Sequence, residues 1–234
     1  MKNVAIIPAR GGSKRIPHKN IKSFEGKPII GYSIETALES GLFDRVIVST
    51  DDPEIASVSK SFGAEIPFLR PVELADDFTG TNAVVKHCLE WLLKNNYPVT
   101  YACCIYATAP FVHKKYLQEG YKQLVDSGKS FAFSITSFPF AIQRALRIKT
   151  DNSVEPIFPE NNFTRSQDLE NTYHDAGQFY WGTKDAFLND EVVYSSKSTG
   201  VILPRFLVQD IDTLEDWHYA ELMYKTLQNY TGAF

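Results

Sequence analysis

The 234-residue sequence has few of the features that are typical of secreted proteins, of proteins stabilised by a structural metal ion, or of membrane-spanning proteins. Its three cysteines, Cys88, Cys103 and Cys104, lack the C-x-x-C spacing of zinc and redox motifs. An odd count with an adjacent pair favours reduced, buried thiols over disulfides. No apolar run approaches the length of a membrane span, and the first one is too short for a signal peptide. These absences predict a soluble, cytoplasmic protein that does not enter a membrane.

Other classes of protein are disfavoured by charge and by spacing. The formal net charge is −4 and the basic residues gather locally, which argues against a nucleic-acid partner. None of the five histidines has metal-ligand spacing to another histidine. No Ser/His/Asp or Cys/His triad can be assembled from the spacing, so covalent catalysis is disfavoured.

Strands and helices alternate along the first 126 residues, which is typical of a parallel sheet with helices on both faces. The predicted strands there are 4–7, 45–50, 65–69 and 101–106, and the predicted helices are 28–40, 53–63, 82–94 and 113–126. Residues 131–173 break the pattern and predict an inserted β-rich arm. Further strands are predicted at 178–181, 201–203 and 206–208, and a last helix at 214–229. The sequence contains no repeat or linker, so we predict one α/β domain over residues 1–234 with a mostly parallel central sheet.

A basic loop, residues 9–20, follows the first predicted strand. Gly11 and Gly12 are adjacent, which lets the backbone turn and approach a ligand closely. Cationic side chains crowd the same loop, namely Arg10, Lys14, Arg15 and Lys19. Exposed backbone N–H groups beside fixed cations form an anion site, and a phosphate chain is the usual anion. The spacing matches neither the P-loop nor G-x-G-x-x-G, and the alternative is a solvated basic turn.

Acidic residues form two further groups. Asp51 and Asp52 follow a predicted strand, at the sheet edge where open α/β folds bind ligands; helix capping is the alternative. Asp210 and Asp212 precede the last helix, and alternation along an extended segment puts both on one side with Ile211 in the core. Two such carboxylates suit magnesium (Mg2+) that also binds phosphate oxygens. The alternative is that this segment only caps the helix, which leaves Asp210 unexplained.

These motifs resemble those of the cytidylyltransferases that activate nonulosonic, sialic-type acids. The stretch from Ile7 to Ile16, with Lys19 and Asn20, carries the most specific part of the resemblance. The other matching blocks are Val48-Ser49-Thr50-Asp51-Asp52, Arg70-Pro71-Val72-Glu73-Leu74 and Asp210-Ile211-Asp212-Thr213. The resemblance covers essentially the whole chain. It implies a three-layer, Rossmann-like nucleotide-sugar transferase fold.

Two stretches depart from the usual sialic acid pattern. Residues 106–110 replace Gln-Pro-Thr-Ser-Pro, and residues 175–181 replace a segment that begins Asn-Gly-Ala. Both departures resemble the branch of the family that uses pseudaminic acid. The implied reaction joins CTP to the sugar acid and gives a CMP-sugar and pyrophosphate, by in-line attack of the anomeric hydroxyl on the α-phosphate.

The resemblance also implies roles for individual positions. Residues implied to bind CTP are Ala9, Arg10, Gly11, Gly12, Ser13, Lys14, Lys19, Asn20, Thr79 and Thr81. Residues implied to face the sugar are Tyr106, Thr108, Arg165, His174, Asp175 and Gln178. The implied catalytic residues are Arg10, Lys14, Lys19 and Asp212, and the magnesium ligands are Asp210 and Asp212. Synthesis of CMP-N-acetylneuraminic acid or CMP-Kdo remains an alternative, as does a non-catalytic nucleotide-sugar binding protein.

The predicted arm indicates a homodimer. Its apolar residues alternate, for example Phe131, Phe133 and Ile135 and then Leu146 and Ile148. An isolated two-stranded hairpin has marginal stability in water and exposes apolar surface. A two-fold dimer would bury that surface. The family resemblance also implies dimerisation through such an arm. A cation in the arm, Arg165, is then expected to meet the sugar carboxylate in the partner's site; the alternatives are a role in its own chain or in a solvated loop.

Overall fold

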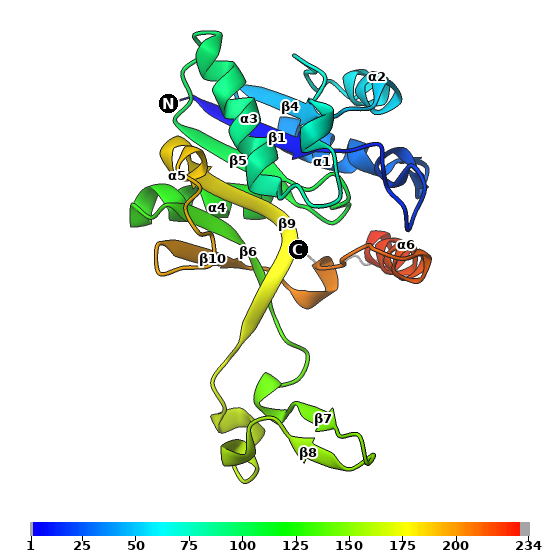
Figure 1. The fold of residues 1–234 in the computed structure, drawn as a ribbon, viewed down its shortest axis with the longest axis vertical. Helices are drawn as coiled ribbons and strands as arrows, with labels where there is room; N and C mark the ends of the chain where they lie inside the picture. Colours follow the sequence, from blue (N-terminus) through cyan, green and yellow to red (C-terminus); the bar gives the residue numbers. More distant parts are fainter. Residues whose placement is uncertain (1, 230–234) are drawn as a thin grey trace.

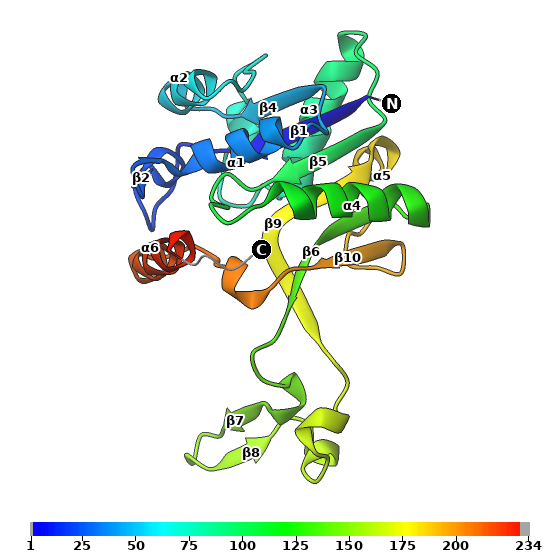
Figure 2. The same ribbon diagram turned by 180° about the vertical axis from the view of Figure 1, so that it is seen from behind.

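The computed structural model describes residues 2–229. Met1 and residues 230–234, which the predicted domain includes, lie outside the described part. A six-stranded sheet in the order β10-β6-β9-β5-β1-β4 forms the centre of the fold (Figures 1 and 2). Its strands are β1 (Asn3–Pro8), β4 (Arg45–Ser49), β5 (Tyr101–Ile105), β6 (Phe131–Ser137), β9 (Tyr173–Thr183) and β10 (Ser198–Ile202). β1 pairs in parallel with β4 and β5, and β6 with β10, whereas β9 runs antiparallel to both its neighbours.

Helices cover both faces of this sheet, so the fold is the predicted three-layer α/β architecture. α3 and α5 lie on the face seen in Figure 1, and α1 and α4 lie on the face seen in Figure 2. The helices are α1 (Ile29–Glu39), α2 (Pro53–Ser61), α3 (Thr81–Lys94), α4 (Lys114–Ser127), α5 (Lys184–Leu188) and α6 (Leu214–Gln228). Among residues 2–229, none of the helices is long and apolar enough to cross a membrane.

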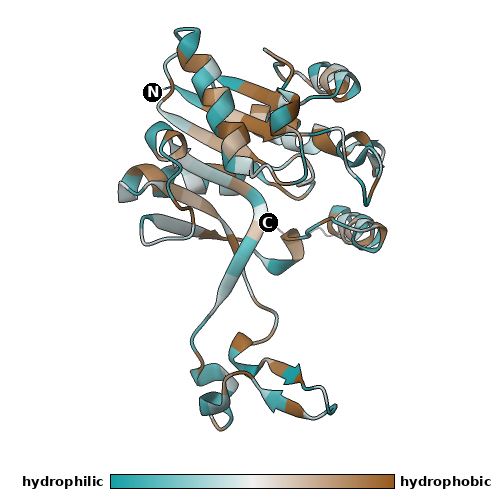
Figure 3. Ribbon diagram, in the orientation of Figure 1, coloured by the Kyte–Doolittle hydropathy of each residue, from teal (hydrophilic) through white to brown (hydrophobic). Residues whose placement is uncertain are grey.

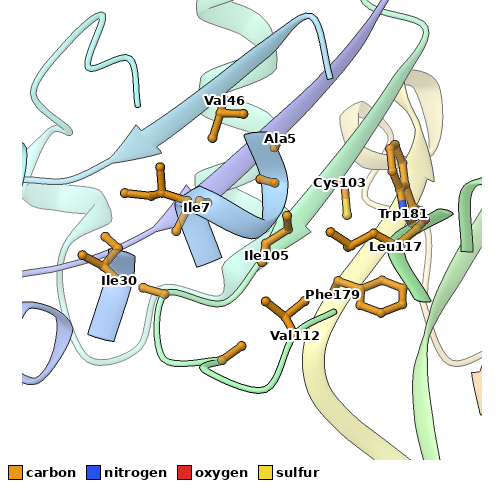
Figure 4. Packing of buried hydrophobic residues seen from close by; sticks show 14 of the residues in the cluster. Ala5, Ile7, Ile30, Val46, Cys103, Ile105, Val112, Leu117, Phe179 and Trp181 are labelled. Carbon is orange, nitrogen blue, oxygen red and sulfur yellow. Dashed lines mark hydrogen bonds between the residues drawn. The ribbon is translucent and has the colours of Figure 1, made fainter. Parts of the chain in front are cut away.

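The buried residues of β1 divide between two hydrophobic layers because successive strand residues point to opposite faces. Val4 and Ile6 pack toward α3, in a cluster that includes Val85 and Leu89. Ala5 and Ile7 pack on the opposite face with residues of α1 and α4 and with Trp181 of β9 (Figure 4). A strand buried on both faces reads as a continuous apolar run, which is why β1 and β5 were predicted correctly. Cys88, Cys103 and Cys104 are buried and form no disulfide, as expected.

A third apolar cluster attaches α6 beside the basic loop. Trp217 and Ala220 of α6 are buried against Ile16 and Phe24, and Ile211 completes the contact. The predicted last helix and the predicted burial of Ile211 are therefore confirmed. Short elements surround this cluster: β2 (Ser23–Phe24), β3 (Lys27–Pro28), and the 3-10 helices η1 (Lys19–Ile21) and η6 (Arg205–Leu207). Another 3-10 helix, η2 (Val72–Leu74), lies between α2 and α3.

Two predicted strands are wrong. Residues 65–69 form no strand and make one isolated bridge, Ile47 to Glu65, at the edge of the sheet beside β4. The next backbone contact with this edge is the hydrogen bond from the Arg70 N–H to the Thr50 carbonyl. Residues 206–208 fall in and just after η6. Pro204 stands directly before that turn, and Leu207 is buried because it packs against α6 rather than in a sheet. Short apolar runs do not distinguish these cases from strands.

The arm begins later than predicted. Phe131–Ser137 is β6, an inner strand of the central sheet, and Phe131 and Phe133 belong to the core. The segment that leaves the sheet is 138–172, and from here "the arm" denotes these residues. It projects away from the body in both views (Figures 1 and 2). It contains the hairpin β7 (Leu146–Ile148) and β8 (Val154–Pro156), with 3-10 helices η3 (Ile142–Arg144), η4 (Pro159–Asn161) and η5 (Ser166–Asp168).

Candidate active site

A cleft of about 630 Å³ opens where β1 and β5 end. Pro8 at the end of β1 and Tyr106 just after β5 contribute to its walls, so it lies at the carboxyl edge of the parallel strands. Open α/β sheets bind ligands at this edge. Predicted CTP residues that line the cleft are Arg10, Ser13, Lys14, Lys19, Asn20, Thr79 and Thr81. Ala9, Gly11 and Gly12 do not line it, and Ala9 is buried behind the loop.

The basic loop is held in place by three contacts. Asn20 is buried and its side-chain amide donates to the Arg10 carbonyl at 2.8 Å. The Gly11 N–H donates to Asp51 Oδ1 at 3.1 Å. A Cβ on Gly11 would lie 2.6 Å from Asp52 Oδ2, so glycine is required there by close packing inside the protein. The loop is therefore built as a fixed turn, which is what preorganised anion binding needs.

The two acidic residues after β4 have separate tasks. Asp52 is the N-cap of α2 and accepts from the N–H groups of Glu54 and Ile55 at 2.7 and 3.1 Å, so the capping alternative is correct for this residue. Asp51 caps nothing in that helix. Its carboxylate braces Gly11 and lies 3.6 Å from the guanidinium of Arg70.

The cations of the loop are paired with acidic residues across the cleft. Arg10 Nη1 and Lys14 Nζ each lie 2.5 Å from Asp77, on different oxygens of its carboxylate. Lys19 Nζ donates to the Ile211 carbonyl at 2.7 Å and lies 3.4 Å from Asp212. Arg15 pairs with Asp212 as well, at 2.9 Å. The basic loop therefore connects two acidic segments that are more than 130 residues apart in sequence.

Arg70 is a site residue that sequence reasoning placed in a matching block without giving it a role. Its side chain is only 3% exposed, yet it lines the cleft. Its Nε and Nη2 atoms have no hydrogen-bond partner within residues 2–229. Burial lowers the pKa of this guanidinium, and the nearby Asp51 carboxylate partly offsets the effect. A buried cation with free donors is a strong candidate to bind an anionic or carbonyl oxygen of a ligand.

Asp210 and Asp212 lie in an irregular segment before α6 rather than at a strand end. Thr213 and Asp216 form a reciprocal capping box, so capping explains Thr213 and leaves Asp210 free for another role. The pKa of Asp210 is raised, first by desolvation and then by repulsion from Asp212. Within the described residues, no three His, Cys, Asp or Glu side chains form a metal cage. Asp212 lines the cleft and pairs with Arg15 and Lys19, whereas Asp210 is exposed and does not line it. Two carboxylates are a donor set that magnesium accepts when phosphate oxygens complete its coordination.

The predicted sugar residues fall into two groups. Tyr106 and Thr108 line the main cleft. Tyr106 also lines an adjoining pocket of about 160 Å³, whose other walls include Tyr180, Val193 and Tyr194. Asp175 holds two of these walls together, because its Oδ2 accepts from the hydroxyls of Tyr180 and Tyr194, the latter at 2.8 Å. Asp175 thus shapes the small pocket through its neighbours.

The remaining predicted sugar residues do not line the cleft. Gln178 is buried and donates to the Leu207 carbonyl at 2.5 Å, which ties β9 to η6. His174 packs on Phe138 at the base of the arm, with 4.8 Å between ring centroids. Arg165 lies in the arm and pairs with Asp168 at 2.7 Å. Within residues 2–229, Arg165 is therefore not among the residues that line the cleft.

Asp77 and Arg70 were missing from the predicted site for a physical reason. Their partners, Arg10, Lys14 and Asp51, lie roughly 20 to 70 residues away in the chain, and no local spacing encodes these contacts. The available signal was position alone, since both residues fall between β4 and α3, on a stretch that crosses the carboxyl edge of the sheet.

This combination of fold and cleft defines a class: an α/β protein that handles a phosphorylated ligand at the carboxyl edge of a mostly parallel sheet. Residues 4–225 match the family model described as "Cytidylyltransferase". The chain belongs to this family.

Named relatives and a solved structure agree with that assignment. The chain is 46% identical, over 100% of both sequences, to a pseudaminic acid cytidylyltransferase of Campylobacter jejuni. It is 32% identical to N-acylneuraminate cytidylyltransferase A of Danio rerio, over 93% of this chain and 49% of that protein. The structure of a CMP:2-keto-3-deoxy-manno-octonic acid synthetase complexed with CTP superposes with a TM-score of 0.70 at 17% identity, over 97% of this chain and 100% of the other. The last likeness supports the fold.

Proposed function

We propose that this enzyme transfers CMP from CTP to pseudaminic acid, giving CMP-pseudaminic acid and pyrophosphate. The 46% identity to a pseudaminic acid cytidylyltransferase along both full lengths supports this assignment. The structural observation that carries it is the cleft at the sheet edge, where Arg10, Lys14 and Lys19 converge from one braced loop. A triphosphate is the ligand class whose charge matches such a set of cations.

The proposed chemistry is in-line attack of the sugar's anomeric hydroxyl on the α-phosphorus. The bond to the β,γ-pyrophosphate breaks as the new phosphoester bond forms, and negative charge develops on the leaving group. Arg10, Lys14 and Lys19 stabilise this charge and hold the phosphates, and Ser13, which also lines the cleft, helps to orient the triphosphate. Because the backbone of the loop that carries these donors is held in place before the ligand arrives, little rearrangement of the loop is needed during the reaction.

We assign the divalent metal site to Asp210 and Asp212, with magnesium as the ion. Bound there, magnesium would supply a Lewis acid beside the phosphate oxygens. Lys19 holds this segment against the basic loop through the Ile211 carbonyl. In this proposal, the contacts of Lys19 with Ile211 and Asp212 keep the metal-binding segment close to the phosphate cations.

The nucleoside and the sugar occupy different parts of the cleft in this proposal. Thr79, Thr81 and Arg70 bind the cytidine side, from the stretch between β4 and α3. Tyr106 and Thr108 face the sugar, and the small pocket beside Tyr106 accepts a compact, mostly apolar substituent such as a methyl or acetamido group. Asp175 supports that pocket, and Gln178 and His174 hold β9 in place around it.

The sugar carboxylate is assigned to a cation from a second subunit. We propose a homodimer in which the arm carries Arg165 to the partner's cleft. Apolar side chains that the arm exposes support an interface there: Phe140, Leu146, Ile148, Val154, Ile157 and Phe163. Figure 3 shows hydrophobic and hydrophilic residues alternating along β7 and β8, as expected for a hairpin that buries one face.

The activity is tested by pyrophosphate release with CTP, magnesium and a panel of nonulosonic acids. Pyrophosphate is expected only when all three components are present, with pseudaminic acid preferred. Equal or faster turnover of N-acetylneuraminic acid would contradict the specificity. Nucleotide binding without any pyrophosphate release would favour a non-catalytic binding protein.

A further inference from the structure

Asp77 holds two of the proposed phosphate cations at once. Its Oδ1 lies 2.5 Å from Arg10 Nη1 and its Oδ2 lies 2.5 Å from Lys14 Nζ. The basic loop and the loop that carries Asp77 form facing parts of the same cleft, because all three side chains line it. The carboxylate therefore takes the positions at which phosphate oxygens would meet these donors.

The loop around Asp77 is shaped to present that carboxylate. The side chain of the preceding residue, Asp76, turns back and accepts from the Thr79 N–H and hydroxyl, both at 2.6 Å, and from the Phe78 N–H at 3.0 Å. Asp76 is thereby committed to the turn, and Asp77 is left to face the cations. The pKa of Asp77 is lowered by its hydrogen bonds from Lys14 and Arg10, so the group is an anion at neutral pH.

A carboxylate with one negative charge and a phosphate chain with several compete for the same donors. The pairs are accessible to water, with 36% of the Asp77 side chain and 79% of the Lys14 side chain exposed. Such exposed pairs are weak and easily exchanged. A highly charged phosphate chain can displace the carboxylate, and a weakly charged anion gains little by doing so.

We propose that Asp77 is an internal competitor for the phosphate cations, which selects ligands by charge and helps to release pyrophosphate. The carboxylate leaves Arg10 and Lys14 when the triphosphate of CTP binds. It returns to them as pyrophosphate departs, so the cations are never left unpaired. The inference rests on the proposed assignment of Arg10 and Lys14 to the phosphates.

Calorimetric titration with pyrophosphate alone tests this idea without requiring turnover. At low ionic strength, Asp77→Asn is expected to bind pyrophosphate about three to ten times more tightly than the wild-type protein, since two weak competing pairs are lost. The gain should shrink at high salt because the contacts are exposed. Asp77→Glu keeps the charge and should stay close to wild type.

Two controls isolate the competitor role. Asp126→Asn removes a carboxylate that pairs with Lys122 on α4, away from the cleft, and should leave pyrophosphate binding unchanged. When both proteins carry Lys14→Ala, adding Asp77→Asn should give a smaller gain in pyrophosphate binding, because only the competition for Arg10 is then relieved. Unchanged or weaker pyrophosphate binding by Asp77→Asn, with a wild-type melting temperature, would overturn the proposal and make Asp77 a residue that positions the cations. Failure of the proposed function would appear separately, as absent pyrophosphate release by the wild-type enzyme.

Discussion

The cleft and the arm differ in how their side chains find partners. In the cleft, cations from the basic loop pair with Asp77 and Asp212, which one chain brings together from distant positions. In the arm, side chains such as Ile148 and Phe163 are 75% and 99% exposed, so the described part of the chain leaves them largely uncovered. The cleft is organised by the fold of one subunit. The arm exposes apolar side chains, and we propose that a second subunit covers them.

This difference separates two kinds of substitution. Substitutions in the cleft should alter catalysis and leave the fold and the assembly intact, because the polar side chains of the cleft lie outside the hydrophobic core. Changes on the arm should alter assembly first and chemistry only as a consequence. The predictions below follow this division from the largest expected effect to the smallest.

Asp210→Asn should lower turnover by about a thousandfold, since loss of a metal carboxylate is worth several kcal/mol in the transition state. Steady-state kinetics with increasing magnesium measures the effect, and high magnesium should restore part of it. The melting temperature should stay near wild type, because the capping box uses Thr213 and Asp216 instead. Thr213→Ala is the matched structural variant and should cost about 1 kcal/mol of stability. A lower melting temperature for Asp210→Asn would favour a structural role.

Lys14→Ala should lower kcat by about 10²–10³, because its cation stabilises charge that grows on the leaving pyrophosphate. Initial rates over a range of CTP concentrations separate kcat from KM. If KM for CTP rises while kcat is unchanged, Lys14 binds the ground state and the proposed role is wrong.

Ile148→Asp should convert the proposed dimer into monomers, because it places a charge in an apolar interface. Light scattering after size-exclusion chromatography measures the mass, and CTP binding should be retained. Leu222→Asp on α6 changes an apolar side chain of similar exposure, 64% against 75%, outside the arm. A wild-type mass for Ile148→Asp, or a loss of dimers in both variants, would contradict the role of the arm.

Tyr194→Phe should raise KM for the sugar about fivefold, which corresponds to loss of one hydrogen bond of about 1 kcal/mol. The hydroxyl that it removes connects the wall of the small pocket to Asp175. KM for CTP serves as the internal control and should not change. An equal change in both constants would show that Tyr194 acts on the whole cleft.

Local signals predicted most of the fold and part of the site. The buried strands and amphipathic helices could be predicted because each depends on a pattern of apolar residues within a short stretch of sequence, as in β1 and α3. The arm's start was misplaced because Phe131 and Phe133 alternate in the same way in a core strand as in an exposed hairpin. Asp77, Arg70 and the clamp of Asp175 on Tyr194 depend on contacts between distant segments. Such contacts follow from the fold and cannot be read from spacing.

The most direct test of whether the arm of one subunit completes the cleft of the other is a mixing experiment. Two variants that are expected to be inactive, Arg165→Ala and Asp210→Asn, are mixed under conditions where subunits exchange. Each mixed dimer would contain one cleft with both its own Asp210 and the partner's Arg165. Random exchange of equal amounts should restore about a quarter of wild-type activity, since half of the dimers are mixed and each has one intact site of two. Exchange is verified independently by mass spectrometry of differently labelled subunits. Confirmed exchange with no recovered activity would contradict the account, because Arg165 would then act within its own chain or outside the site.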